Sequence, residues 1–201
     1  MNQQLTELKQ DYPTTFVFKK AQSPDEYCAI YQSRLDICKN DFPYMLDMDS
    51  DFPAKDRFDD YSILFYVTEN NNVVASCRIT PYKDQEWEIS QNLPDHLDLN
   101  IETCKAVQLN RVYIDESYRN KNLHAFMFYH FSEWVLMNTL YTTYFAICKL
   151  ALVRLYKNIG ASSVITDGFY LNGRAEHKYY LVAGEIADFN LLIQNKYLKK
   201  N

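Results

Sequence analysis

The feature that most constrains this chain is the stretch 107–124, which reads VQLNRVYIDESYRNKNLH. Residues 107–114 place Val, Leu and Ile among polar side chains, a pattern that favours a β-strand. A polar, partly basic turn over 115–122 follows, and the aromatic-rich apolar run from Leu123 predicts a helix over 122–139. A strand, turn and helix in this order can present backbone N–H groups to an anion at the helix start. The stretch therefore predicts a cradle for a pyrophosphate or phosphopantetheine arm.

Charge and composition argue against several classes of protein. A net charge of −5 argues against general nucleic-acid binding, and 4 glycines are few for a glycine-rich phosphate loop. The 5 cysteines are widely spaced without a C-x-x-C pair, which argues against a zinc site or a disulfide scaffold. His124 and His130 lack the i, i+4 spacing of a metal-binding pair, so no metal site is expected.

The apolar segments bear on location and on the kind of ligand. The start of the chain, MNQQLTELKQDYP, is polar and lacks the apolar segment of a secretory signal. No apolar run is long and uninterrupted enough to span a bilayer, so we expect a cytoplasmic protein. The aromatic share of 15% fits either a core packed with rings or a long apolar pocket lined by them.

Hydrophobic periodicity predicts alternating strands and helices along the chain. The expected strands are 14–19, 63–68, 73–80, 107–114, 144–147, 164–166 and 178–182, and the expected helices are 24–38, 122–139, 150–158 and the tail 188–200. The long loop 40–60 carries aromatic anchors, and a loop of this length is often functional. This order predicts a mixed α/β fold in one domain, 1–201, with a twisted central sheet of about seven strands. Residues 1–13 would be a mobile arm or a short helix, and 188–201 a C-terminal helix.

The order of elements and two motifs resemble the GNAT acyltransferase fold over roughly 24–182. The sequence Arg-Asn-Lys-Asn-Leu-His at 119–124 is similar to the acyl-donor motif Gln/Arg-x-x-Gly-x-Gly/Ala of that family, with Asn122 and His124 in the glycine positions. Residues 151–160 are similar to a later helix of the family, A-x-x-L-Y-x-x-x-G-F. The resemblance implies that Tyr156 protonates the departing thiolate, although a core tyrosine on an amphipathic helix would give the same pattern. It also implies a donor site of Val112, Tyr113, Ile114, Arg119, Asn120, Lys121, Asn122, Leu123 and His124.

Three further blocks, 56–59, 75–81 and 108–111, are similar in order and spacing to the autoinducer-synthase branch of the same family. That branch includes acyl-homoserine-lactone synthases and long-chain N-acyl amino acid synthases. The resemblance implies an acceptor site of Arg34, Asp56, Arg78 and Arg111. Two glutamates of the branch are replaced, by Ala54 and Gln108, and these departures favour an amino acid or amine acceptor over S-adenosylmethionine.

Transfer of an acyl group from a thioester to an amine needs a neutral amine, a polarised carbonyl and a proton for the thiolate. Gln108 cannot titrate, so it could only orient water or the amine. Asp59 and Glu102 are the carboxylates expected near the site, and a relay of water to bulk solvent is an equal alternative for the base. Asp56, Asp59, Arg78 and Arg111 would also form salt bridges that fix the long loop to the sheet, and this role is compatible with framing an acceptor pocket.

The predicted function is therefore an N-acyltransferase that moves an acyl group, expected to be a fatty acyl chain, from acyl carrier protein or CoA to an amino acid or small amine. The acyl thioester would be a co-substrate, with no tightly bound cofactor. Basic residues are expected to rim the donor entrance and attract an acidic carrier protein, unless they form only a solvated face. These are Arg119, Lys121, Lys149, Arg154 and Lys157. Two other functions stay open: an acetyl-CoA-dependent GNAT acting on an amine or protein, and a non-catalytic acyl-binding module.

Overall fold

The computed structural model describes residues 16–41, 43–84, 86–91, 93–94, 101–119, 121–161, 163–164, 167–171 and 174–198. Its strands are β1 (Phe16–Lys20), β2 (Ile63–Glu69), β3 (Asn72–Pro81), β4 (Ala106–Ile114), β5 (Thr143–Lys149), β6 (Ser163–Val164), β7 (Phe169–Leu171) and β8 (Arg174–Glu185). Its α-helices are α1 (Pro24–Asp41), α2 (Leu123–Asn138), α3 (Leu150–Asn158) and α4 (Ile186–Ile193). Short helical turns are η1 (Pro43–Met45), η2 (Arg57–Asp60), η3 (Glu88–Gln91), η4 (Glu116–Tyr118) and η5 (Gln194–Leu198). The mobile arm predicted for 1–13 lies outside the described residues.

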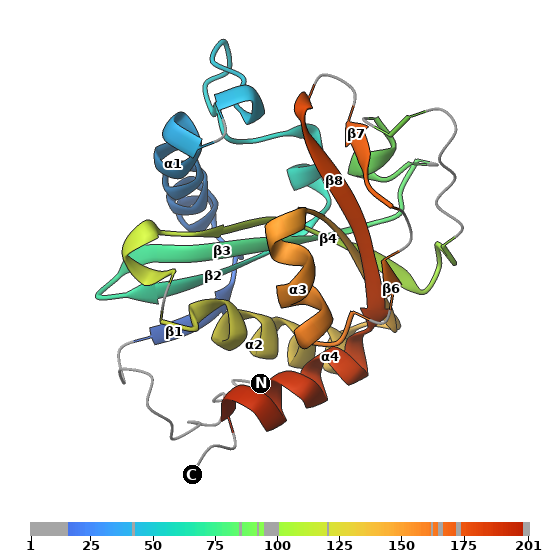
Figure 1. Ribbon diagram of the computed structural model, residues 1–201. Helices are drawn as coiled ribbons and strands as arrows, with labels where there is room; N and C mark the ends of the chain where they lie inside the picture. Colours follow the sequence, from blue (N-terminus) through green and yellow to red (C-terminus); the bar gives the residue numbers. More distant parts are fainter. Residues whose placement is uncertain are drawn as a thin grey trace.

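The strands form one mixed sheet, and Figure 1 shows it at the centre of the molecule. The order is β1-β2-β3-β4-β5-β8-β6, with β7 paired to β8. Neighbouring strands are antiparallel except β4 and β5, which run parallel. The predicted mixed α/β fold is confirmed, and the described residues form eight strands where about seven were expected. The additional strand is β7, whose three residues are too few to show a periodic pattern.

Local sequence signals set several element ends as expected. The N–H of Ser23 donates to Glu26 Oε2 at 2.9 Å and the N–H of Glu26 donates to Ser23 Oγ at 3.3 Å, which forms a capping box at the start of α1. Asn70 and Asn71 turn the chain between β2 and β3 with φ of 50° and 67°. Asparagine adopts this left-handed conformation more readily than other residues with a side chain, because its short amide can bond locally.

Other elements cover both faces of the sheet, so the side chains of a central strand such as β2 are buried on both sides. In β2, Leu64 and Tyr66 belong to the cluster under α1, whereas Phe65 and Val67 belong to the main core. Successive side chains of a strand point to opposite faces, so α1 lies on one face and the main core on the other. Figure 1 shows α2 and α4 on the side of the sheet opposite α1. The helix α3 contacts β5 and β8.

The parallel pair β4 and β5 opens partway along its length. The two strands pair at only three positions, Ala106 with Thr143, Val107 with Tyr144, and Gln108 with Phe145. Beyond these, β4 continues to Ile114 and β5 to Lys149 without pairing to each other. The register between β3 and β4 also shifts where Arg111 has φ of 48°. A bulge of this kind bends a strand, so the two strands diverge and leave space between them.

Candidate active site

A pocket with a cavity volume of about 200 Å³, partly open to solvent, lies where β4 and β5 diverge. Its lining comes from 108–113 of β4, 147–149 at the end of β5, and Tyr44, Met45, Glu88, Ile89, Leu152, Leu171 and Tyr179. Most of these side chains are apolar, and the charged ones are Glu88, Arg111 and Lys149. An apolar pocket with a few polar groups is typical of a small-molecule site.

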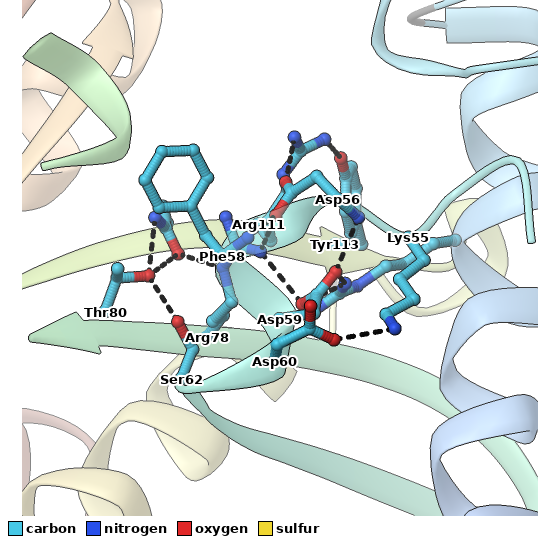
Figure 2. Close-up of polar contacts among 12 residues, drawn as sticks. Lys55, Asp56, Phe58, Asp59, Asp60, Ser62, Arg78, Thr80, Arg111 and Tyr113 are labelled. Atoms are coloured by element: carbon cyan, nitrogen blue, oxygen red, sulfur yellow. Dashed lines mark hydrogen bonds and ion pairs between the residues drawn. The ribbon is translucent and has the colours of Figure 1, made fainter. Parts of the chain in front are cut away.

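A network of buried charges lies beside this pocket (Figure 2). Arg34 Nη1 lies 2.9 Å from Asp59 Oδ1, and Arg78 Nη1 lies 2.9 Å from the same oxygen. Arg78 Nη1 also contacts Asp56 Oδ1 at 2.6 Å, while Arg111 Nη2 pairs with Asp56 Oδ2. The structure thus joins α1, η2, β3 and β4 through five residues that the sequence motifs singled out. We call these five residues together with Glu88 the ion cluster.

Two of the carboxylates also shape the chain that carries them. The N–H of Phe58 donates to Asp56 Oδ1 at 2.8 Å, and the N–H of Asp56 donates to Asp59 Oδ2 at 3.0 Å. This reciprocal arrangement caps η2. Because the same carboxylates accept from the backbone and from guanidinium groups, they fix the end of the loop 40–60 to the sheet. The predicted structural salt bridging is therefore present.

The charges of the ion cluster support one another. Burial alone would raise the pKa of Asp56, but Arg78 and Arg111 outweigh this effect and lower the pKa to about 2. Burial tends to lower the pKa of Arg78, yet Glu88, Asp59 and Asp56 raise it above its ordinary value. The acids favour the charged form of Arg78 just as the arginines favour that of Asp56, so the two groups stay ionised around neutral pH.

Glu88 is the member of the ion cluster that the sequence motifs did not reveal. It lies on η3 and lines the pocket. Its Oε2 lies 2.9 Å from Arg78 Nη2, its Oε1 lies 3.1 Å from Arg111 Nη2, and Asn110 Nδ2 donates to it. The only local signal was its position between Trp87 and Ile89, two apolar residues in a polar stretch that anchor η3 in a small core.

The predicted bases are placed very differently from one another. Gln108 lines the pocket, and its Oε1 accepts from the N–H of Ile89 at 3.2 Å, so it holds η3 in place. Asp59 is buried in its ion pairs and does not line the pocket. Glu102 is on the surface with Lys105 at 3.0 Å, also away from the pocket lining. Glu102 was expected near the site, but its exposed side chain pairs with Lys105 and is not among the residues that line the pocket.

The predicted donor residues divide into two groups. Val112 and Tyr113 line the pocket, and Ile114 follows them in β4. The turn residues Arg119, Lys121, Asn122, Leu123 and His124 are not part of the pocket lining. Asn120 lies outside the described residues. The pocket and the turn are therefore joined by the end of β4, as a donor that runs from the turn to the pocket would require.

Individual side chains of the turn have distinct surroundings. Arg119 Nε donates to the carbonyl of Ile114 at 3.3 Å, and Lys121 Nζ lies 4.4 Å from the ring centre of Tyr118. Asn122 begins α2 with φ of 54°, the conformation that glycine adopts most easily. Leu123 is buried in the main core, and burial lowers the pKa of the His124 imidazole.

Tyr156 lies deeper than a role at the leaving group suggests. It is buried in the main core, with its ring centre 6.2 Å from that of Phe128, and does not line the pocket. Burial, with a smaller contribution from Cys148, raises the pKa of its phenol. The phenol therefore stays protonated, as an acid must, and Cys148 is the neighbour that does line the pocket. The role of Tyr156 in catalysis stays a prediction.

Two other kinds of site have no counterpart in the described part of the chain. Among the described residues, no group of three or more His, Cys, Asp and Glu side chains could hold a metal ion. Within the same part of the chain, no helix is both long and apolar enough to cross a membrane.

Comparison with known proteins supports the class that this geometry suggests. Residues 42–129 match the family model described as an acetyltransferase (GNAT) domain. No curated protein sequence matches the chain significantly. Residues 42–129 are therefore similar to a GNAT acetyltransferase domain, and the mixed α/β fold agrees with that similarity.

Solved structures share this fold at low sequence identity. The acyl-homoserine-lactone synthase LasI is 11% identical with a TM-score of 0.75, and the match covers 92% of this chain and 98% of LasI. FeeM, an N-acyl amino acid synthase from uncultured soil microbes, is 12% identical with a TM-score of 0.65, covering 90% and 97%. Escherichia coli ElaA is 16% identical with a TM-score of 0.58, covering 85% and 99%. LasI and FeeM match the branch that the motifs resemble.

Proposed function

We propose that this protein moves a fatty acyl group from a carrier-protein or CoA thioester to the amine of an amino acid or small amine. The observation that carries the proposal is the pocket itself, which combines mostly apolar walls with two charged members of the ion cluster, Glu88 and Arg111. An acyl chain needs the apolar walls, and a polar acceptor needs the charged groups.

The pocket's position in the fold supports acyl transfer in particular. Its walls include β4 on both sides of the bulge at Arg111. Because β4 and β5 do not pair beyond Gln108 and Phe145, backbone N–H groups of β4 there are not used in bonds to β5. A backbone N–H aimed at a thioester carbonyl would polarise it and stabilise the negative charge that develops on its oxygen.

Positive charge near the expected donor entrance supports a donor that carries negative charge, either on a carrier protein or on the phosphates of CoA. Lys149 lines the pocket, and Arg154 and Lys157 are exposed on α3. Arg119 and Lys121 are exposed on the turn before α2. Positive charge near a binding site speeds the encounter with an acidic partner.

The direct test is an acceptor and donor panel. The purified protein is incubated with acetyl, octanoyl and palmitoyl thioesters of CoA and of acyl carrier protein, each with the common amino acids and small primary amines. Mass spectrometry then detects the acylated amine, and a thiol reagent measures the released thiol. Absence of an acylated amine from every pair would contradict the proposal, and a preference for acetyl-CoA would favour the short-chain GNAT function.

A variant pair tests whether the pocket holds the chain. Leu152 on α3 lines the pocket, whereas Leu150 on the same helix does not and is 63% exposed. Leu152→Trp should reduce transfer of the palmitoyl group by about tenfold or more relative to acetyl, because filling the pocket removes the space for the longer chain. Leu150→Trp, the matched control, should leave the ratio unchanged.

A further inference from the structure

We propose that Glu88 is the specificity-determining residue that binds the acceptor's amine, with Gln108 as the positioning residue that holds it in the pocket. This inference rests on the proposed function and names the group that recognises the acceptor. Glu88 is the single carboxylate among the described residues that line the pocket. Asp56 and Asp59 are not part of the lining, so they cannot serve an acceptor in the same way.

The ion cluster fixes the Glu88 carboxylate in one orientation. Each of its oxygens contacts a different guanidinium group, Oε2 that of Arg78 at 2.9 Å and Oε1 that of Arg111 at 3.1 Å. Its side chain is 14% exposed, whereas the side chain of Arg78 is fully buried. Arg78 and Asn110 Nδ2 both donate to Oε2, so the lone pair left on Oε1 is the one that can accept from a ligand in the pocket. A carboxylate held in advance need not reorganise when it binds a charged ligand.

The charge balance of the ion cluster shows why a carboxylate is needed here. Three arginines, Arg34, Arg78 and Arg111, face two aspartates from η2 and its N-cap. Glu88 supplies the third negative charge, and it comes from η3 rather than from β4, where Gln108 is neutral. Without Glu88, the pocket lining would carry Arg111 and Lys149 and would repel a cationic amine.

Gln108 places Glu88 through the backbone. Its Oε1 accepts from the N–H of Ile89, the residue that follows Glu88, at 3.2 Å. The ring of Trp87 packs edge-on against Phe145 of β5 at 4.8 Å between ring centres. Residues on both sides of Glu88 are therefore tied to the two diverging strands, so the carboxylate is held at the place where those strands separate.

The chemistry that follows needs no net proton change at Glu88. The amine binds to the carboxylate as an ammonium, loses one proton to solvent, and then donates an N–H hydrogen bond to Glu88. Its nitrogen forms the C–N bond as the C–S bond breaks. The nitrogen then gives up a second proton, and the departing thiolate takes one, so the products are an amide and a thiol.

The test compares a cationic acceptor with a neutral one. Octanoyl-CoA is the donor, and ethylamine, cationic at neutral pH, and hydroxylamine, neutral there, are the acceptors. Glu88→Gln should raise the KM for ethylamine by about ten- to hundredfold, as expected for losing a hydrogen bond between charged groups. The KM and the kcat with hydroxylamine should change little, whereas the melting temperature should fall because Arg78 and Arg111 lose a charged partner. Glu88→Asp should recover part of the ethylamine KM.

The control is Glu86→Gln. Glu86 lies two residues before Glu88 and pairs with Arg57 at 2.6 Å outside the pocket, so this change removes the same charge from the same segment. It should leave both KM values unchanged. Gln108→Ala should raise the KM for ethylamine in the same direction as Glu88→Gln, and Gln108→Glu should not.

The outcomes separate this inference from the proposed function. If the wild-type protein acylates neither probe nor any amine of the acceptor panel, the proposed function is wrong. If it acylates them but Glu88→Gln changes ethylamine and hydroxylamine equally, or changes neither, Glu88 is not the amine-binding residue. An equal loss with both probes together with a lower melting temperature would assign Glu88 a structural role instead.

Discussion

The ion cluster and the turn before α2 both carry basic side chains, but those of the ion cluster are buried and those of the turn are exposed. Arg34 and Arg78 have side chains that are 1% and 0% exposed, and each contacts a carboxylate. Arg119 and Lys121 are exposed on the turn. Burial of a charge without a partner costs several kcal/mol, whereas an exposed charge keeps its water. Sequence changes in the ion cluster should therefore affect folding, and changes in the turn should affect mainly encounter with the donor.

The two regions also differ in how their backbone is held in place. The carboxylates at η2 are fixed by side-chain and backbone hydrogen bonds together. The start of α2 depends on one left-handed residue, Asn122, which makes no side-chain cap hydrogen bond. The ion cluster is held by paired groups, so changing one partner disturbs the other. The turn before α2 is held by the backbone conformation of one residue, so a single substitution there can raise or lower stability.

The largest effect is expected when one partner is removed from the buried pairs. Asp59→Ala leaves Arg34 and Arg78 without a shared carboxylate and should lower the free energy of unfolding by about 3–5 kcal/mol. Asp60→Ala is the matched control, because Asp60 pairs with Lys55 on the surface of the same turn and should cost less than about 1 kcal/mol. Urea denaturation measures both, and equal losses would contradict the contrast between buried and exposed charges.

A smaller effect is expected from the titration of Asp56. Since its pKa is lowered to about 2 in the folded state, its contribution is full above the unfolded value near 3.8 and is lost as pH falls toward 2. The difference corresponds to about 2 kcal/mol. Asp56→Asn should flatten the fall in stability over this interval of pH, measured by denaturation at a series of pH values. An unchanged slope would show that Asp56 is not held by Arg78 and Arg111 as described.

The next effect tests the conformation of Asn122. Asn122→Gly should keep or slightly raise the free energy of unfolding, because glycine adopts φ near 54° without strain. Asn122→Ala should lower it by about 1 kcal/mol, the approximate penalty for a left-handed residue with a Cβ atom. Thermal unfolding of the two variants measures the difference. Alanine at least as stable as glycine would mean that the left-handed turn is not maintained in solution.

The smallest effect on stability is expected in the turn's basic side chains. Lys121→Ala removes an exposed contact with the ring of Tyr118 and should change the free energy of unfolding by about 0.5 kcal/mol or less. If the turn attracts an acidic carrier protein, the KM for the acyl-carrier-protein donor should rise at low salt and rise less at high salt. The same KM at every salt concentration would remove the turn from carrier-protein recognition.

Much of the fold could be predicted because its signals are local. The capping box at Ser23 and Glu26, the asparagine turn after β2, and the glycine after α3 each specify an element end within a few residues. Strands such as β2 and β4 also have enough residues for their patterns to be read. The strand β7 could not be predicted, because three residues are too few to show a periodic pattern, although its partner β8 follows closely in the chain.

Part of the candidate site could be predicted for a different reason. Buried charges require partners, so the motif residues Arg34, Asp56, Asp59, Arg78 and Arg111 share a physical requirement that follows from their residue types. Glu102 and Asp59 could not be ranked as bases, because exposure and burial depend on which segments pack over them. The depth of Tyr156 in the core has the same origin.

The sequence by itself determined most of the strands and helices, where the main turns fall, and that Asp56, Asp59, Arg78 and Arg111 pair with one another. It did so because capping, periodicity and charge pairing are properties of residue types at short or characteristic spacings. Only the tertiary structure decided that β4 and β5 separate after three pairs, and that Glu88 of η3 reaches the opening. The divergence and the place of Glu88 arise from packing between segments far apart in the chain, which no local pattern encodes.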